Sequence, residues 1–123
     1  MLLYRFNSDE ESVLLKVALI GYGKMGRAIE AAAQLLEVEV VARISHTSMS
    51  EEWDKISHAE VCIDFTAPHA VLDNIRRLAP YRKPLVLGTS GWYHQLNEVQ
   101  ALVEEYNLGV VYLKSKKTIK TMV

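Results

Sequence analysis

The chain has 123 residues, of which 50% are hydrophobic and 24% charged, and its formal net charge is -1 at pH 7. Such a length fits one globular domain with a hydrophobic core, and not two domains of full size. Lysine is concentrated only near the end of the chain, so composition argues against a nucleic acid or an anionic membrane as partner. No apolar run approaches the roughly 20 residues that span a bilayer, so we expect a cytoplasmic protein.

Strand and helix patterns alternate after a polar, acidic opening segment. Residues 1–13 are expected to be a flexible leader because charged and small polar side chains follow one another there. The run 14–20 is almost entirely apolar, which is typical of a strand buried on both faces of a parallel sheet. Apolar residues at steps of three and four then predict a helix over 24–36, and 38–44 is predicted to be a second strand.

The middle of the chain repeats the strand-helix order. Ser48 and Glu51 fit a capping box and predict a short helix. The apolar run 59–65 predicts a third strand. Thr66 as N-cap and Pro68 in the first turn predict that a helix with one apolar face follows.

The last third predicts a strand over 84–88, a helix over 94–106 and a strand over 109–113. We therefore expect an α/β, Rossmann-like, doubly wound fold: a mainly parallel sheet with helices on both faces, in a single domain over 14–113. The lysine-rich residues 114–123 are expected to be a disordered tail.

Three glycines follow the first buried strand and open the first helix. Gly21, Gly23 and Gly26 form a GxGxxG pattern, in which the glycines allow a tight turn, a close approach of backbone to pyrophosphate and close packing of helix on strand. The helix N-terminus adds free N–H groups and a partial positive charge. The pattern indicates a dinucleotide site, although a glycine-rich turn without a ligand remains the alternative.

The end of the second strand bears on the choice of dinucleotide. NAD sites often hold the ribose with a carboxylate about 20 residues after the glycines, but this chain has Ser45 and neighbouring hydroxyl residues there. The missing carboxylate and the nearby Arg43 slightly favour NADP, because a carboxylate would repel a 2′-phosphate. Serine and backbone groups can also hold NAD, so NADPH and NADH both remain open.

Two further loops are predicted to reach the same edge of the sheet. Residues 64–68 read DFTAP and residues 88–92 read GTSGW, and each stretch ends a predicted strand. Ligands of open parallel sheets bind at the carboxyl ends of the strands. We therefore expect both loops to meet the cofactor.

The stretches IGYGKMGRAIE, CIDFTAPHAV and VLGTSGW, in this order and spacing, resemble the amino-terminal domain of the 4-hydroxy-tetrahydrodipicolinate reductase family, also called dihydrodipicolinate reductases. The similarity runs from Lys16 to Tyr112. The resemblance implies that the pyrophosphate is cradled by Gly21, Tyr22, Gly23, Lys24, Met25 and Gly26, and that the cofactor groove is lined by Phe65 and Thr66. It also implies that the nicotinamide ribose and ring lie beside Gly88, Thr89 and Ser90. The family usually has threonine in place of Ser90.

The resemblance implies reduction of a cyclic intermediate of the diaminopimelate and lysine pathway by NADPH or NADH, in a homotetramer. Family members continue after this domain with an Asn-Phe-Ser segment and a second domain carrying a His-His-x-x-Lys motif. This chain reads LKSKKTIKTMV at that place, so no residue is assigned a catalytic role. We expect it to supply the cofactor-binding domain and to be inactive alone.

Other chemistry finds little support in the sequence. The four histidines lack the spacing of metal ligands, so no metal is expected. Cys62 lies in an apolar run and fits a buried structural thiol, and Ser90 is not in a GxSxG elbow because Trp92 replaces its last glycine. Two alternatives to the reductase remain: a non-catalytic dinucleotide-binding module or fragment, and another two-domain dehydrogenase, against which DFTAP and GTSGW argue.

Overall fold

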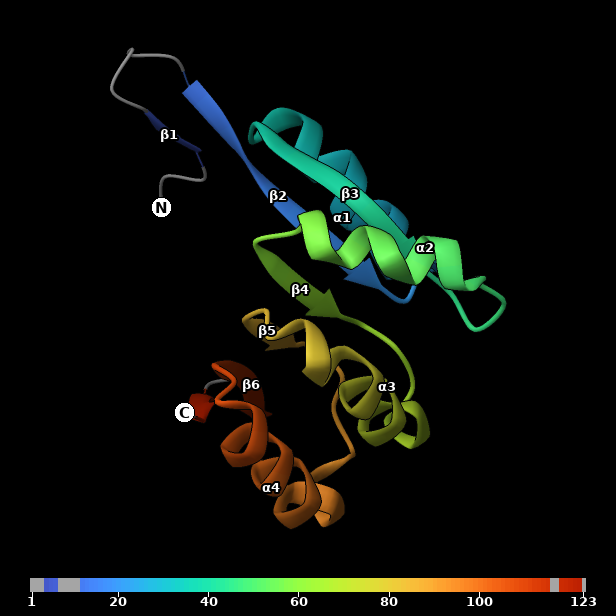
Figure 1. The fold of residues 1–123 in the computed structure, drawn as a ribbon, viewed down its shortest axis with the longest axis vertical. Coiled ribbons are helices and arrows are strands. Elements are labelled where there is room, and N and C mark those ends of the chain that lie inside the picture. The colour runs from blue at the N-terminus through green and yellow to red at the C-terminus, as the bar shows by residue number, and fades with distance from the viewer. Residues whose placement is uncertain (1–3, 7–11, 116–117, 123) are drawn as a thin grey trace.

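Parallel strands form the middle of a seven-stranded sheet in the computed structural model, which describes residues 4–6, 12–115 and 118–122 (Figure 1). The parallel strands lie in the order β3-β2-β4-β5-β6. Because β2 stands between β3 and β4, the chain winds to one side of β2 first and then to the other, as the doubly wound prediction requires. The bounds are β2 Ser12–Ile20, β3 Val38–Ile44, β4 Val61–Asp64, β5 Leu85–Leu87 and β6 Val110–Ser115.

Antiparallel strands occupy both ends of the chain, where the sequence predicted no regular structure. β1 (Tyr4–Phe6) pairs with the start of β2, inside the expected flexible leader. β7 (Thr118–Met122) pairs with β6 inside the expected disordered tail, so the prediction of disorder is wrong for these residues. The physical reason is that β7 satisfies the outer backbone groups of β6, and Met122 is only 6% exposed. Ser12 and Val13 of the expected leader begin β2, and Lys114 and Ser115 of the expected tail end β6. The other leader and tail residues lie outside the described ranges.

Helices cover both faces of the sheet, which confirms the predicted architecture. In Figure 1, α1 lies behind the sheet, whereas α2, α3 and α4 lie in front of it. No helix among the described residues is long and apolar enough to cross a membrane. The bounds are α1 Lys24–Leu35, α2 Ser50–Asp54, α3 Val71–Leu78 and α4 Leu96–Tyr106, with short 3-10 turns at Lys55–His58, Pro68–Ala70, Ala79–Tyr81 and Tyr93–Gln95.

Two helix starts differ from the predicted caps. The Ser48 hydroxyl accepts a hydrogen bond from the backbone N–H of Ser45 at 2.8 Å, and α2 begins after Met49 without a side-chain cap. The Thr66 hydroxyl donates to Asp64 Oδ1 at 2.7 Å, so it does not cap the turn that precedes α3. In both cases the hydroxyl is bonded to a group that precedes the helix, the Ser45 N–H or the Asp64 carboxylate, and not to a helical N–H.

The core lies between the sheet and the helices and contains both aromatic and aliphatic side chains. Trp92 is fully buried, and Val99 and Val103 of α4 have no exposed surface. Cys62 is 1% exposed, and burial raises the pKa of its thiol to about 12. A thiol that stays protonated in an apolar core is a poor nucleophile, in agreement with the structural role predicted for it.

Candidate functional site

The carboxyl ends of β2, β3 and β4 surround a cavity of about 610 Å³. This is the point where the strand order changes direction, the usual ligand position in doubly wound sheets. The second wall of the cavity comes from α3 and the loop before it. The sequence-predicted residues that line the cavity are Gly21, Tyr22, Gly23, Ser45, Phe65 and Thr66.

The three glycines differ in the space available for a side chain. Gly21 has a φ of +96°, and a Cβ atom there would lie 2.4 Å from the carbonyl oxygen of Phe65. A Cβ on Gly26 would lie 2.4 Å from the carbonyl oxygen of Gly21. A Cβ on Gly23, in contrast, would meet no atom within 4 Å. A tight turn therefore explains Gly21 and Gly26, whereas Gly23 leaves open space beside the cavity that it lines.

The start of α1 presents backbone donors next to this space. Gly23 is the N-cap, no side chain caps the helix, and its first turn contains no acidic residue. The N–H groups of the first turn and the helix dipole are therefore available to an anion. Lys24 and Met25 follow on the exposed surface of the first turn, and neither they nor the buried Gly26 line the cavity.

A buried carboxylate joins the DFTAP and GTSGW loops. Asp64 has no exposed surface, and its Oδ1 accepts hydrogen bonds from the Thr66 N–H at 3.0 Å and the Thr89 hydroxyl at 3.1 Å. The Thr66 N–H also reaches the Thr89 hydroxyl at 2.8 Å. Burial raises the pKa of Asp64, while the bonds from Thr66 and Thr89 oppose that shift. The network fixes the two loops relative to each other at the edge of the site.

The rest of the GTSGW loop lies behind the cavity wall. A Cβ on Gly88 would lie 2.1 Å from Cε1 of Phe65, so glycine is needed for the ring to pack there. Thr89 is 6% exposed and points into the Asp64 network, whereas Ser90 is on the surface. Gly88, Thr89 and Ser90 therefore do not line the cavity. Gly88 packs against the ring of Phe65, which does line it.

Arg43 also lies outside the cavity lining, because α1 holds its side chain. Its Nε donates to Glu30 Oε1 at 2.8 Å, and its Nη2 makes a second short contact with Glu30 Oε2. The Tyr22 hydroxyl donates to the same carboxylate at 2.6 Å. These bonds, the one from Arg43 first, lower the pKa of Glu30 to about 2.

Several cavity residues were not predicted from the sequence. They come from α2, α3 and the loops before them, and they are His46, Trp53, His69, Asp73, Asn74 and Arg77. The signal for three of them was the polar side of α3, one turn after DFTAP, but the sequence does not reveal which part of that side faces a ligand. No three His, Cys, Asp or Glu residues in the described ranges lie close enough together to hold a metal ion.

Comparison with known proteins agrees with the motifs. Residues 15–115 match the model of a family described as "Dihydrodipicolinate reductase, N-terminus". The chain belongs to this family. The resemblance inferred from the three sequence stretches is therefore confirmed, and the matched region ends at the last residue of β6.

Reductases from several bacteria are similar to this member of the dihydrodipicolinate reductase family. The 4-hydroxy-tetrahydrodipicolinate reductase of Christiangramia forsetii is 26% identical over 98 residues, which are 80% of this chain and 41% of the relative. That of Zymomonas mobilis is 33% identical over 103 residues, covering 76% of this chain and 40% of the relative. The chain thus spans about two fifths of the length of these curated relatives.

Solved structures support the Rossmann-like fold of the family member. A dipicolinate-bound dihydrodipicolinate reductase from Paenisporosarcina sp. TG-14 has a TM-score of 0.62 at 23% identity, over 84% of this chain and 48% of that one. A pyrroline carboxylate reductase from Plasmodium falciparum, solved with NADP bound, has a TM-score of 0.59 at 16% identity, over 80% and 41% of the two chains. At these identities the likeness concerns the fold.

Proposed function

We propose that this chain binds NADPH or NADH at the carboxyl ends of β2, β3 and β4 and forms the cofactor-binding domain of a 4-hydroxy-tetrahydrodipicolinate reductase. The observation that carries the proposal is Gly23, which has open space where a side chain would stand and which lies at the uncapped start of α1 beside the cavity. A pyrophosphate needs such a combination of close backbone approach and free N–H donors.

In this proposal, each part of the edge contacts a different part of the dinucleotide. The turn and the first helical residues hold the pyrophosphate, the end of β3 meets the adenosine ribose, and the loops after β4 and β5 face the nicotinamide half. The proposed contacts are, in that order, Gly21, Tyr22, Gly23, Lys24, Met25 and Gly26; Arg43 and Ser45; and Phe65, Thr66, Gly88, Thr89 and Ser90.

The reaction proposed for the whole enzyme is reduction of 4-hydroxy-tetrahydrodipicolinate in diaminopimelate and lysine biosynthesis. A bound nicotinamide would supply the hydride. The residues of this chain would bind and orient the dinucleotide, and the Asp64 network would hold two of its loops in place. The 123 residues contain no His-His-x-x-Lys motif, so we propose that this polypeptide by itself binds cofactor without turning over substrate.

Calorimetric titration of the purified chain with NADPH and with NADH tests the proposal. We expect saturable binding of at least one of them at micromolar to low millimolar concentration. Gly23→Ala is the sharpest variant, because the added methyl group meets no protein atom within 4 Å but occupies the space proposed for the pyrophosphate. We expect it to weaken binding about tenfold or more while thermal unfolding stays close to wild type, since 1.4 kcal/mol corresponds to a factor of ten.

Gly109→Ala is a matched control, because its added methyl group also meets no atom within 4 Å and Gly109 lies outside the cavity. Its affinity for the dinucleotide should equal that of the wild type. Absence of saturable binding of both dinucleotides to the wild-type chain would contradict the proposed site. Reductase turnover by the 123-residue polypeptide would contradict the proposal that it acts only as the binding domain.

A further inference from the structure

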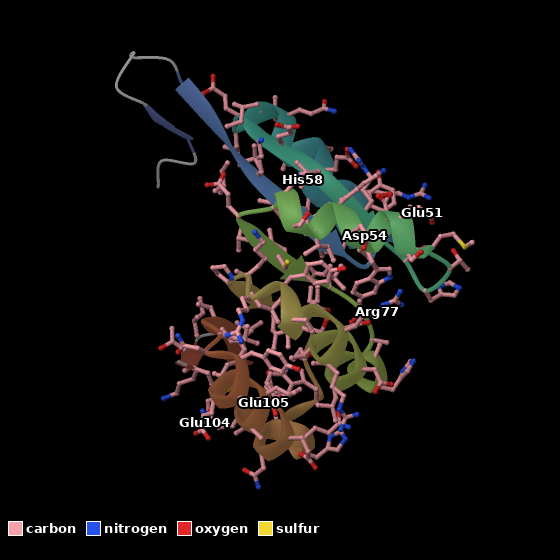
Figure 2. All side chains as sticks on the ribbon, in the orientation of Figure 1. Glu51, Asp54, His58, Arg77, Glu104 and Glu105 are labelled. Carbon is pink, nitrogen blue, oxygen red and sulfur yellow. The ribbon has the colours of Figure 1, made fainter. Side chains whose placement is uncertain are left out.

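One cationic side chain of the cavity wall has no hydrogen-bond or ion-pair partner in the described part of the chain. Arg77 lies on α3 and lines the cavity, and in Figure 2 its side chain lies between α3 and α2. Its guanidinium carbon is 4.0 Å from the ring centroid of Trp53, which is 5% exposed. No hydrogen bond or ion pair joins Arg77 to another described residue, so its N–H groups remain free to bind a ligand.

The contact with Trp53 holds the guanidinium over the indole ring. A cation in this position is attracted by the face of the ring. Because Trp53 of α2 is buried and belongs to the hydrophobic core, it is a fixed support for the more exposed arginine. A cation held in this way loses less side-chain entropy when it binds an anion than a free surface arginine does.

Two other arginines near the site, Arg43 and Arg76, do not line the cavity. Arg43 is bonded twice to Glu30 and lies outside the lining. Arg76, the neighbour of Arg77 on α3, does not line the cavity and pairs with Asp73 at 3.3 Å. Arg77 is therefore the arginine that a negatively charged group inside the cavity would meet.

The cavity wall after β3 contains no carboxylate that would repel a phosphate. After β3, Ser45 and His46 line the cavity, and the Ser45 hydroxyl lies 3.1 Å from the hydroxyl of Thr47, which is outside the lining. No carboxylate of this loop stands where NAD sites hold the ribose. Asp73 is the acidic residue in the cavity lining, and its side chain is 81% exposed and paired with Arg76.

We infer that Arg77 recognises the phosphomonoester on the adenosine ribose of NADPH, with the Ser45 hydroxyl after β3 as a neutral partner, and so gives the site a preference for NADPH over NADH. This inference rests on the proposed dinucleotide site and adds its specificity. The sequence favoured NADP partly because of Arg43 on β3, whereas this inference assigns the choice between NADPH and NADH to Arg77 on α3. Arginine is suited to the role because its forked donors match the oxygens of a phosphate.

Paired titrations of NADPH and NADH to wild-type chain, Arg77→Gln and Arg76→Gln test the inference. We expect wild type to bind NADPH about tenfold or more tightly than NADH, the scale of one lost charge-assisted contact. Arg77→Gln should remove most of this preference by weakening NADPH alone, with the Kd of NADH within about twofold of wild type. Arg76→Gln removes an equal charge from the same helix and should leave both constants unchanged.

Competition with 2′,5′-ADP and with 5′-ADP measures the same preference on the wild-type chain without any variant. The first compound carries the ribose phosphate and should displace bound dinucleotide at lower concentration than the second. Equal affinities of wild type for NADPH and NADH, or equal losses of both in Arg77→Gln, would overturn the inference and leave the proposed function standing. Binding of neither dinucleotide to the wild-type chain would overturn the proposed function, and the inference with it.

Discussion

At the scale of a single residue, the hydroxyl group of Thr89 joins the GTSGW loop to the DFTAP loop. It is 6% exposed, its oxygen lies 2.8 Å from the Thr66 N–H, and it donates to Asp64 Oδ1 at 3.1 Å. Thr89→Val keeps the shape of the side chain but removes the hydroxyl, leaving a buried carboxylate with one donor fewer. We expect urea unfolding to show a loss of about 1–3 kcal/mol, the usual cost of unsatisfying a buried polar group.

Ser90 provides the matched control for this loss. It is the next residue in the GTSGW loop, it is exposed, and no hydrogen bond joins its side chain to another described residue. Ser90→Ala should therefore change the free energy of unfolding by less than about 0.5 kcal/mol. Equal effects of the two substitutions would mean that the Asp64 network does not hold the loops together.

At the scale of secondary-structure elements, an acid-dependent contact joins α1 to β3. Glu30 of α1 accepts from Arg43 of β3 and from Tyr22 in the glycine turn. The pKa of Glu30 is lowered from 4.5 to about 2, so the folded state favours its ionised form. The stabilisation is fully present above pH 4.5 and is lost as the pH falls through about 2.

We therefore expect Glu30→Gln to weaken the dependence of the free energy of unfolding on pH below pH 4.5. Urea midpoints measured between pH 7 and pH 2 should fall less steeply below pH 4.5 in the variant than in wild type, because the variant has no proton to take up there. Glu51→Gln is the control, since Glu51 is exposed and forms no hydrogen bond or ion pair with any described residue. Identical curves for wild type and Glu30→Gln would show that the α1–β3 contact does not contribute.

At the scale of the whole molecule, the buried strands and the glycine turn could be predicted because their signals are local. The apolar run 38–44 matches β3 at both ends, and Gly21 has the positive φ that its turn demands. Arg77 could not be assigned to the cavity, because its position depends on how Trp53 of α2 packs against α3. β7 was not predicted for a similar reason. Its lysine-rich composition is typical of an exposed tail, and the strand forms because it pairs with the edge of β6.

The pairing of β7 predicts unequal roles for its two large apolar side chains. Met122 lies opposite Val110, is 6% exposed and belongs to the hydrophobic core, whereas Ile119 lies opposite Leu113 and is 67% exposed. Met122→Ala should lower the free energy of unfolding by about 2–4 kcal/mol, because it removes buried volume that the core cannot refill. Ile119→Ala should cost less than about 0.5 kcal/mol in the same urea titration.

The comparison between these two variants separates an ordered strand from a disordered tail. In a disordered tail both side chains would be exposed to solvent in the native state, and neither truncation would change the unfolding midpoint. A large loss for Met122→Ala alone requires that the end of β7 pack on the sheet. Because β6 is paired with β5 on one edge and with β7 on the other, it is an interior strand of the described sheet and offers no unpaired edge for association.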